Sequence, residues 1–427
     1  MDTPQEVMGA RAKSGSRTEE IRQAAAKLFE GTGYSSTTIT DIANAVGILP
    51  GSLYHHFASK EDVALEIVAE FEREASELAS ALLARLDAPG ATGARARLSQ
   101  TAEDIADLSA RNRAALRLIA YAAPTTAAER FSQARESTTS SLSRVWKRLV
   151  DDLVPNAAPD TQDVGLLRFA LGNLTLFGSV NALVSTHPRS TADLHVAMLL
   201  DGIALDTPSD DDLDRSDAMV AAREAIAGWG PLEEATEPNS REHLVAAART
   251  EFARRGFDAT TVRDIAEAAQ IRMGTLYRRV ASKDELLGDI LGAYDAHMDA
   301  AVRAVLTAGD SAVESLDALA FVMVVAKRRF RLESDIVKLA YPRTTAPATS
   351  ALKSYWASTD MRLRLLEATL TRGTKAGSIR PLGAPAEIGP QIRYISRVPY
   401  EDFARASPER AHRFLRNSLL RGFLNPR

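Results

Sequence analysis

Apolar residues recur every three to four positions through most of the chain, which is the spacing of amphipathic helices. The first such helix is predicted from about Thr18 to Glu30, and Gly31 and Gly33 end it. Its inward stripe consists of Ile21, Ala25, Leu28 and Phe29. Few segments alternate as strands do, so the pattern predicts an all-α protein.

Two shorter helices follow, separated by a tight turn. Thr38-Ile39-Thr40-Asp41 has the form of a capping box, with Asp in place of the usual Glu, and predicts the start of the second helix. Gly47 predicts the turn, because glycine adopts positive φ at little cost. The third helix is predicted over Gly51–Phe57. Three helices with a glycine turn between the second and the third indicate a helix-turn-helix.

The third predicted helix has two unlike faces. Leu53 and Phe57 are four residues apart and therefore share one apolar face. The opposite face presents a small residue, a hydroxyl, a phenol and an imidazole, from Gly51, Ser52, Tyr54 and His55. A helix that enters a DNA major groove needs this arrangement, with an anchored back and outer groups that reach phosphates and base edges.

The chain then repeats itself. Gly256 follows Gly33 by 223 positions, and the same offset needs no gap across the whole helix-turn-helix window. It links Phe252 to Phe29, Thr261 to Thr38, Asp264 to Asp41, Gly274 to Gly51, Tyr277 to Tyr54 and Lys283 to Lys60. Residues 419–423 also echo residues 199–203 at an offset of 220. A repeat of this length is a domain duplication that covers the whole unit.

The remaining segments read as helices and one linker. Helices are expected near 95–121, 127–153, 162–186 and 190–205, whereas aspartates cluster between 207 and 238, with one short helix possible over 216–227. The predicted domains are a disordered N-terminal arm (1–16), a first helix-turn-helix domain (17–62), a first helical ligand-binding domain (63–206), an acidic linker (207–238), a second helix-turn-helix domain (239–285) and a second ligand-binding domain (286–427). An extended linker of that length would leave the two units free relative to each other.

Composition narrows the function classes. The 427 residues contain no cysteine, which excludes disulfides and thiolate sites and fits a cytoplasmic location. No apolar run is long enough to span a membrane, and the polar N-terminus has no signal core. The net charge of −4 does not indicate nucleic-acid binding, but local charge does. Residues 241–283 carry nine basic and five acidic side chains, and residues 11–60 carry six and four.

The two helix-turn-helix stretches resemble a known family. Arg17 through Val63 is similar to the DNA-binding domain of the TetR repressors, and Arg241 through Leu287 resembles it again. The resemblance rests on Ala24-Ala25-Ala26-Lys27-Leu28-Phe29, Gly33-Tyr34, Thr37-Thr38-Ile39, Asp41-Ile42-Ala43, Gly51-Ser52-Leu53-Tyr54, Phe57 and Ser59-Lys60. It implies repression of transcription that a small molecule relieves, and a homodimer in ordinary members. The chain looks like two members fused, similar to double-TetR regulators, some of which control lipid-import operons of the mammalian-cell-entry type.

The resemblance also implies DNA contacts, position by position. In the first copy these are Thr38, Thr40, Ser52, Tyr54, His55 and Lys60. In the second copy they are Thr261, Arg263, Thr275, Tyr277, Arg278 and Lys283, to which Arg272 is added because arginine contacts guanine edges. The second copy departs from the pattern twice: Gln270 replaces the turn glycine, and Val280 replaces Phe57. Both departures put its folding or docking in doubt.

Fusion predicts an asymmetric pseudo-dimer. The ends of the two units, 190–205 and 408–424, are expected to form a shared helical interface, and further homo-oligomerisation stays open. The two reading helices need not be the same, and they are not. Leu49 and His55 correspond to Arg272 and Arg278. We therefore expect one chain to read double-stranded operator DNA with two unequal half-sites.

A small hydrophobic effector, such as a lipid, a steroid or an aromatic compound, is the expected ligand. Candidate pocket residues in the first copy are Tyr121, Trp146, Phe169, Asn173 and Phe177. In the second copy they are Phe321, Met323, Tyr341, Tyr355 and Trp356. A plain bundle core explains each aromatic equally well, and Asn173 is equally consistent with a satisfied core amide.

Two other function classes stay open. An all-α enzyme is disfavoured, because no phosphate-binding loop follows a strand and no nucleophile–base arrangement is evident. The adjacent His55 and His56 point about 100° apart on a helix and make a poor metal pair, so no metal and no cofactor is expected. The other alternative is a scaffold or sensor whose second DNA-binding domain is inert. Retention of Tyr277 and Lys283 argues against it.

Overall fold

The structure is a computed structural model and describes residues 4–88, 93–121, 128–155, 162–178, 187–230, 240–339, 349–397 and 406–425. Within these ranges the protein is all-α, and the only strand-like feature is a single bridge between Ala204 and Ile379. By its contacts the chain divides into two compact units. Residues 1–91 and 107–145 belong to the first unit, and residues 92–106, 146–341 and 348–427 belong to the second.

The first unit contains the first helix-turn-helix. Its helices are α1 (Pro4–Gly31), α2 (Ile39–Val46), α3 (Pro50–Leu53), α4 (Lys60–Asp87) and α6 (Arg113–Tyr121), while α5 (Ala94–Arg111) and α7 (Ala128–Leu153) hold residues of both units. α1 packs against α2, α4 and α6. It begins at Pro4 and therefore includes most of the predicted N-terminal arm, residues 1–16. Most residues of that stretch have good helix propensity, and single glycines do not stop the helix.

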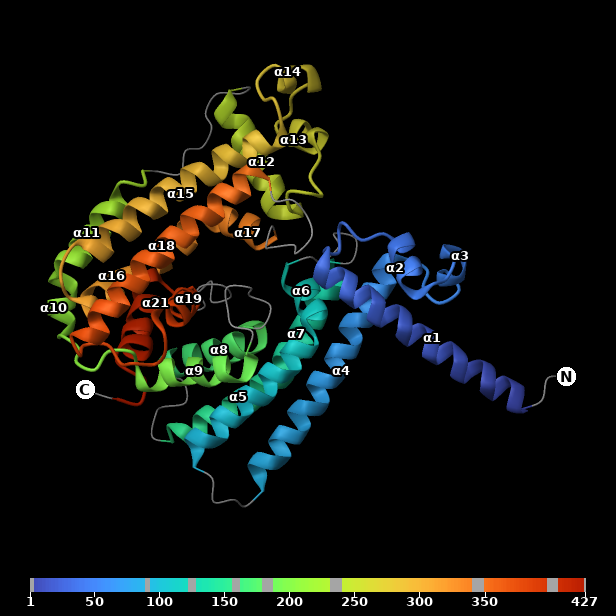
Figure 1. Cartoon of the computed structure of the whole chain (residues 1–427), viewed down its shortest axis with the longest axis horizontal. Helices are drawn as coiled ribbons and strands as arrows, with labels where there is room; N and C mark the ends of the chain where they lie inside the picture. The colour runs from blue at the N-terminus through green and yellow to red at the C-terminus, as the bar shows by residue number, and fades with distance from the viewer. Residues whose placement is uncertain are drawn as a thin grey trace. The chain divides into compact units, whose positions relative to one another are not determined.

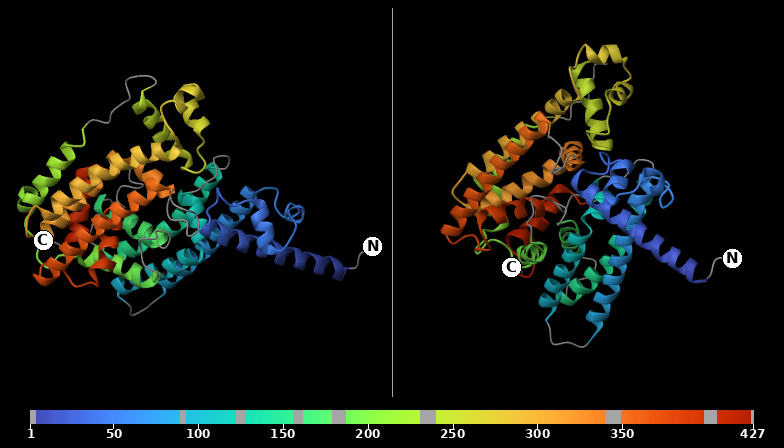
Figure 2. Two further views of the ribbon diagram at one scale, coloured as in Figure 1. Left: turned by 45° about the horizontal axis from the view of Figure 1, so that its top comes forward. Right: turned by 45° about the vertical axis from the view of Figure 1, so that its right-hand side comes forward.

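The second unit contains the second copy and the last helices of the first copy (Figure 1). Its helices are α8 (Gln162–Phe177), α9 (Pro188–Asp201), α10 (Asp210–Arg215), α11 (Asp217–Ala227), α12 (Arg241–Arg255), α13 (Val262–Ala268), α14 (Met273–Tyr277), α15 (Lys283–Thr307), α16 (Ala312–Arg329), α17 (Arg331–Leu339), α18 (Ser350–Lys375), α19 (Pro385–Ile395), α21 (Pro408–Leu415) and the π-helical turn η2 (Arg416–Leu420). The long helices α15 and α18 run side by side, and α12–α14 lie at one end of α15 (Figure 2).

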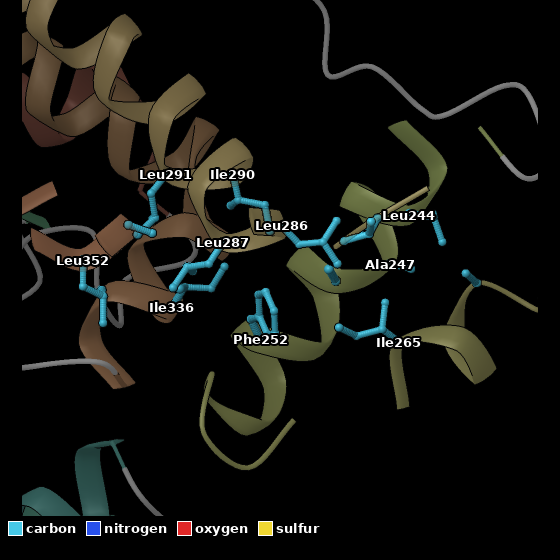
Figure 3. Packing of buried hydrophobic residues seen from close by; sticks show 14 of the residues in the cluster. Leu244, Ala247, Phe252, Ile265, Leu286, Leu287, Ile290, Leu291, Ile336 and Leu352 are labelled. Carbon is cyan, nitrogen blue, oxygen red and sulfur yellow. The ribbon is translucent and has the colours of Figure 1, made fainter. Parts of the chain in front are cut away.

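A continuous apolar cluster fixes the second helix-turn-helix to α15. Phe252 of α12 and Ile265 of α13 are fully buried, together with Leu287 at the start of α15 (Figure 3). The same cluster continues through Ile336 and Leu352, from α17 and α18. Burying side chains of this size is worth about 1.5–3 kcal/mol each, so movements of α15 are coupled to the reading helix by packing.

The predicted acidic linker is ordered over the part that the structure describes. α11 packs on α15 and α16, and it buries Met219 and Ala222. Two aspartates of α10 also pair with the C-terminal segment: Asp214 accepts a hydrogen bond from Arg416 at 2.6 Å, and Asp210 lies 2.6 Å from Arg421. The expectation of an open tether is therefore wrong for residues 207–230. The aspartates are partners of arginines about 200 positions away, which composition does not reveal.

The ends of the two copies are hydrogen-bonded to each other inside the second unit. Ile203 N donates to Leu419 O at 2.9 Å, and Phe423 N donates to Leu199 O at 3.0 Å. A second reciprocal pair links Ala204 N to Leu420 O at 2.9 Å and Leu424 N to Leu200 O at 3.0 Å. At the offset of 220, Ile203 is equivalent to Phe423 and Leu199 is equivalent to Leu419, so the first two bonds are the same bond made in opposite directions. This reciprocal exchange is the pattern of a two-fold interface. We call residues 199–204 and 419–424 the seam.

Two glycines make the seam possible. Gly202 and Gly422 have φ of +76° and +95°, a region that other residues rarely adopt. A Cβ at Gly202 would lie 2.3 Å from the carbonyl carbon of Arg421, and one at Gly422 would lie 2.4 Å from that of Asp201. The two backbones therefore touch where no side chain fits.

A buried histidine of α9 predicts acid sensitivity. His195 of α9 is fully buried, and its Nε2 lies 2.7 Å from Oε1 of Gln391 on α19. Burial lowers the pKa of His195 to about 4, although the bond to Gln391 opposes this shift. Because the unfolded chain takes up this proton first, stability is lost as the pH falls from about 6.5 toward 4. We expect a loss of about 2 kcal/mol at pH 5 from this group.

Urea unfolding at pH 7 and pH 5 measures this loss. His195→Gln should remove that part of the acid loss, and His55→Gln, at an exposed position, should retain it. An identical acid loss in wild type and His195→Gln would contradict the assignment.

Candidate nucleic-acid interfaces

The turn of the first helix-turn-helix is built by local bonds. Thr38 caps α2: its hydroxyl accepts from Asp41 N at 3.1 Å, and its own N–H donates to Asp41 Oδ2 at 2.8 Å. The Thr38 hydroxyl also donates to Asp41 Oδ2 at 2.7 Å, and this bond together with the one from the Thr38 N–H lowers the pKa of Asp41. Gly47 ends the helix at φ +72°, and Ile48 N then donates to Ala43 O at 3.0 Å. The predicted capping box and glycine turn are both confirmed.

The second copy repeats this geometry with a strained residue. Thr261 and Asp264 form the same capping box, and Ile271 N donates to Ala266 O at 2.9 Å. Gln270 occupies the turn with φ +54°, the only positive φ outside glycine in the described ranges. The turn therefore forms without glycine, at an expected cost of roughly 1–2 kcal/mol.

Exchanging the two turn residues should shift stability in opposite directions. Gln270→Gly should stabilise the second helix-turn-helix by about 1 kcal/mol, since the strain outweighs the added freedom of the unfolded chain. Gly47→Gln should destabilise the first by about 1–2 kcal/mol. Hydrogen exchange of the amides in α12–α13 and α1–α2 reports each domain separately. A Gln270→Gly protein with faster exchange in α13 would contradict the prediction.

The reading helices are shorter than the sequence predicts. α3 ends at Leu53 and continues as tight turns, because His56 N returns to Leu53 O at 2.9 Å. The apolar face is nevertheless as expected: Leu53 and Phe57 are buried, as are Leu276 and Val280 in the second copy. Val280 is thus buried at the position that Phe57 occupies in the first copy.

Predicted contact residues gather on the opposite face of each copy. Tyr54 is 55% exposed and Tyr277 is 60% exposed, which is unusual for tyrosines beside a buried core. Thr38, Thr40, Ser52 and His55 are also exposed in the first copy, as are Thr261, Arg263, Arg272 and Arg278 in the second, whereas Thr275 is half-buried. Arg278 lies 3.4 Å from the Thr275 hydroxyl, and Arg263 is paired with Glu267 at 2.9 Å.

The charge of the two faces differs. Arg272, Arg278 and Arg279 are exposed, and among the described residues Arg279 acts electrostatically on Glu242, whereas Arg272 and Arg278 form no ion pair. At the equivalent positions the first copy has Leu49, which is 76% exposed, and two histidines. One of these, His56, is turned inward onto Thr18 at 3.2 Å. The second face is therefore the more basic of the two.

Two predicted phosphate-binding lysines are engaged inside their own domains. Lys60 Nζ donates to Tyr34 O and Thr37 O, both at 2.8 Å, and lies 4.3 Å from the centre of the Tyr34 ring. Lys283 Nζ donates to the matching carbonyls of Phe257 and Thr260 at 2.7 and 2.9 Å. Burial lowers the pKa of both lysines. Each lysine holds the loop before the second helix, a role that the sequence does not indicate, and two of its three N–H groups are occupied.

Several of the predicted ligand-binding residues are buried in the helical core. In the first copy, Trp146 and Phe177 are buried and Phe169 is half-buried. Trp146 Nε1 and Asn173 Oδ1 are buried without a hydrogen-bond partner. The side chain of Tyr121 and all of Tyr341 lie outside the described residues. In the second copy, Met323 and Tyr355 are buried, Tyr355 contacts Trp356 edge-on, and the Phe321 ring lies tilted against His412.

No large cavity joins these residues in the described parts. A small cavity of about 10 Å³ lies between Leu316, Ile392 and Leu419, near the seam, and none of the candidates lines it. Ligand pockets usually enclose roughly 300–1,000 Å³. Within the described ranges no group of three or more His, Asp or Glu side chains is placed to hold a metal ion, and no helix is long and apolar enough to cross a membrane.

The family model "Bacterial regulatory proteins, tetR family" matches the chain twice, at residues 21–67 and 244–290. Both helix-turn-helix domains belong to the tetR family. The two TetR domains coincide with α1–α4 and α12–α15, whose caps, turns and buried faces are described above. The chain is thus a tandem, all-α arrangement of two TetR-like units.

Two of the matching relatives are named transcriptional repressors. The HTH-type transcriptional repressor KstR2 of Rhodococcus jostii is 51% identical over 69 residues, 16% of this chain and 33% of that protein. Its Mycolicibacterium smegmatis counterpart is 47% identical over 60 residues, 14% of this chain and 29% of that protein. The matches therefore span about a third of these relatives. A crystal structure named "Probable transcriptional regulatory protein RHA5900" is 26% identical over 45% of this chain and all of that one, with a TM-score of 0.36.

Proposed function

We propose that the protein is a sequence-specific DNA-binding repressor of transcription, working in the cytoplasm. The observation that carries this proposal is the pair of exposed tyrosine faces, each backed by a buried apolar anchor and each presented by a TetR-family domain. Hydroxyls and tyrosines suit phosphate contacts, and unpaired arginines suit guanine edges. The similar KstR2 proteins are named transcriptional repressors, which supports the assignment.

One chain supplies both reading heads in this proposal. The reciprocal hydrogen bonds of the seam are of the kind that join two identical chains in a two-fold dimer, and here they join two parts of one chain. Covalent linkage allows the heads to differ, and the arginines of the second head have no counterparts in the first. The second head is therefore expected to prefer guanine-rich sequence.

Relief by a small effector is the finer part of the proposal. We propose residues 63–206 and 286–427 as the two effector-binding domains. In the first, Trp146 Nε1 and Asn173 Oδ1 are buried without a hydrogen-bond partner, which supports a polar contact to a ligand there. An apolar molecule with a hydroxyl group would satisfy both atoms, because the hydroxyl oxygen accepts from Trp146 Nε1 and its hydrogen is donated to Asn173 Oδ1. A ligand shifts DNA binding only if its affinity differs between the two states. Long-chain alcohols and hydroxysteroids that leave both melting temperature and DNA affinity unchanged would count against this part.

Binding to the DNA upstream of the protein's own gene tests the main proposal. Wild-type protein should shift that fragment, with affinity that falls steeply as salt rises from 50 to 200 mM. Tyr54→Ala and Tyr277→Ala should weaken binding at different halves of the footprint. Absence of a shift on every upstream fragment tested, or binding that ignores salt, would reject a DNA-binding repressor.

A further inference from the structure

Each reading helix carries a glycine that the fold does not require. Gly51 and Gly274 occupy equivalent positions in α3 and α14, and neither is among the positive-φ glycines of the described chain. A Cβ built on either residue would meet no heavy atom within 4 Å. Alanine would therefore fit both positions without moving the protein, and it favours a helical backbone more than glycine does.

Some glycines have a reason inside the protein, whereas others, such as Gly165 and Gly288, are as open as Gly51. Gly47 needs its positive φ, and a Cβ at Gly373 would lie 2.4 Å from the Ile379 side chain. Gly292 of α15 is open like Gly51, but the first copy has Ala69 at its equivalent position. The fold thus accepts alanine at that open glycine and leaves Gly51 and Gly274 unexplained.

The surrounding exposed surface makes the two glycines distinctive. Between residues 49 and 57 the exposed side chains differ in the second copy: Leu49 is replaced by Arg272, and His55 by Arg278. Three residues are the same in both copies: the glycine, the tyrosine three positions later, and a leucine (Leu53 and Leu276) that is buried. The exposed residues that the two copies share are thus a glycine without a side chain and a nearby exposed tyrosine.

We propose that DNA approaches the backbone of Gly51 and Gly274 so closely that it occupies the space of a Cβ. This inference rests on the proposed DNA-binding function and adds a steric requirement to it. With a methyl group at either position, the helix would stand farther from the groove. Ser52 and Tyr54, or Thr275 and Tyr277, would then lose reach to the phosphates together.

The test compares alanine at three glycines on the fragment that wild-type protein protects. Gly51→Ala and Gly274→Ala should each raise the DNA Kd on the order of tenfold, with an unchanged or higher melting temperature. Gly51→Leu should raise it further. Gly292→Ala, the matched control at an open helical glycine away from α14, should leave the Kd at the wild-type value.

The outcomes separate this inference from the proposed function. If wild-type protein protects no fragment, the DNA-binding function itself fails. If wild type binds and Gly51→Ala and Gly274→Ala bind equally well, the function stands and the close approach is wrong. If these alanine variants lose melting temperature along with affinity, the glycines serve the fold, and the inference is again overturned.

Discussion

Gly202→Ala and Gly422→Ala should each break the pairing of the two copies. The added Cβ would lie within 2.4 Å of the opposing backbone at either position, and neither backbone can yield without losing the seam hydrogen bonds. Positive φ costs a non-glycine residue about 1–3 kcal/mol, and overpacking costs about 1–3 kcal/mol more. We therefore expect each variant to lose roughly 2–6 kcal/mol in urea unfolding of the second unit.

A glycine with positive φ but no close neighbour separates the backbone cost from the overpacking cost. Gly377 has φ +72°, close to that of Gly202, but nothing lies within 4 Å of its Cβ position. Gly377→Ala should therefore carry the backbone cost alone and keep the seam. If Gly202→Ala destabilises the protein no more than Gly377→Ala does, the close backbone contact at the seam is wrong.

Removing the two unpaired arginines of the second head should nearly abolish preference at one half of the operator. Arg272 and Arg278 are exposed without acidic partners, so their guanidinium groups are available to DNA. Each bidentate contact to guanine is worth about 1–3 kcal/mol, so Arg272→Ala/Arg278→Ala should lose about 2–6 kcal/mol of binding free energy. Titrations of DNA fragments with single changes in each half measure this loss.

The matching change in the first head is the control. Leu49→Ala/His55→Ala removes the equivalent side chains, which make no guanidinium contact, and should lose less affinity at the other half. The arginine variant should also show a shallower dependence on salt, because fewer phosphate counterions are displaced. Equal losses from the two double variants would contradict the assignment of unequal heads.

Local features of both heads could be read from the sequence. The capping boxes at Thr38 and Thr261, the turn at Gly47 and the buried anchors at Leu53 and Leu276 depend on residues within a few positions of each other. A short window of sequence therefore contains the residues that predict them. The duplication itself needed only a constant offset between the copies.

Features that depend on distant partners could not be read in this way. The resemblance implies that Lys60 contacts DNA, but its ammonium group lies on carbonyls more than 20 positions earlier. The aspartates before α11 looked like a solvated tether, although Asp214 pairs with Arg416. Periodicity also overestimated the length of α3, since it cannot distinguish a helix from a helical turn that closes early.

The stoichiometry of the DNA complex tests the central claim most directly. Sedimentation of the protein with the shortest fully protected duplex gives the number of chains per operator. The account predicts one chain bound across two unequal half-sites, with Tyr54→Ala and Tyr277→Ala each opening a different half of the footprint. Two chains on a symmetric site, or a Tyr277→Ala protein that binds like wild type, would contradict it.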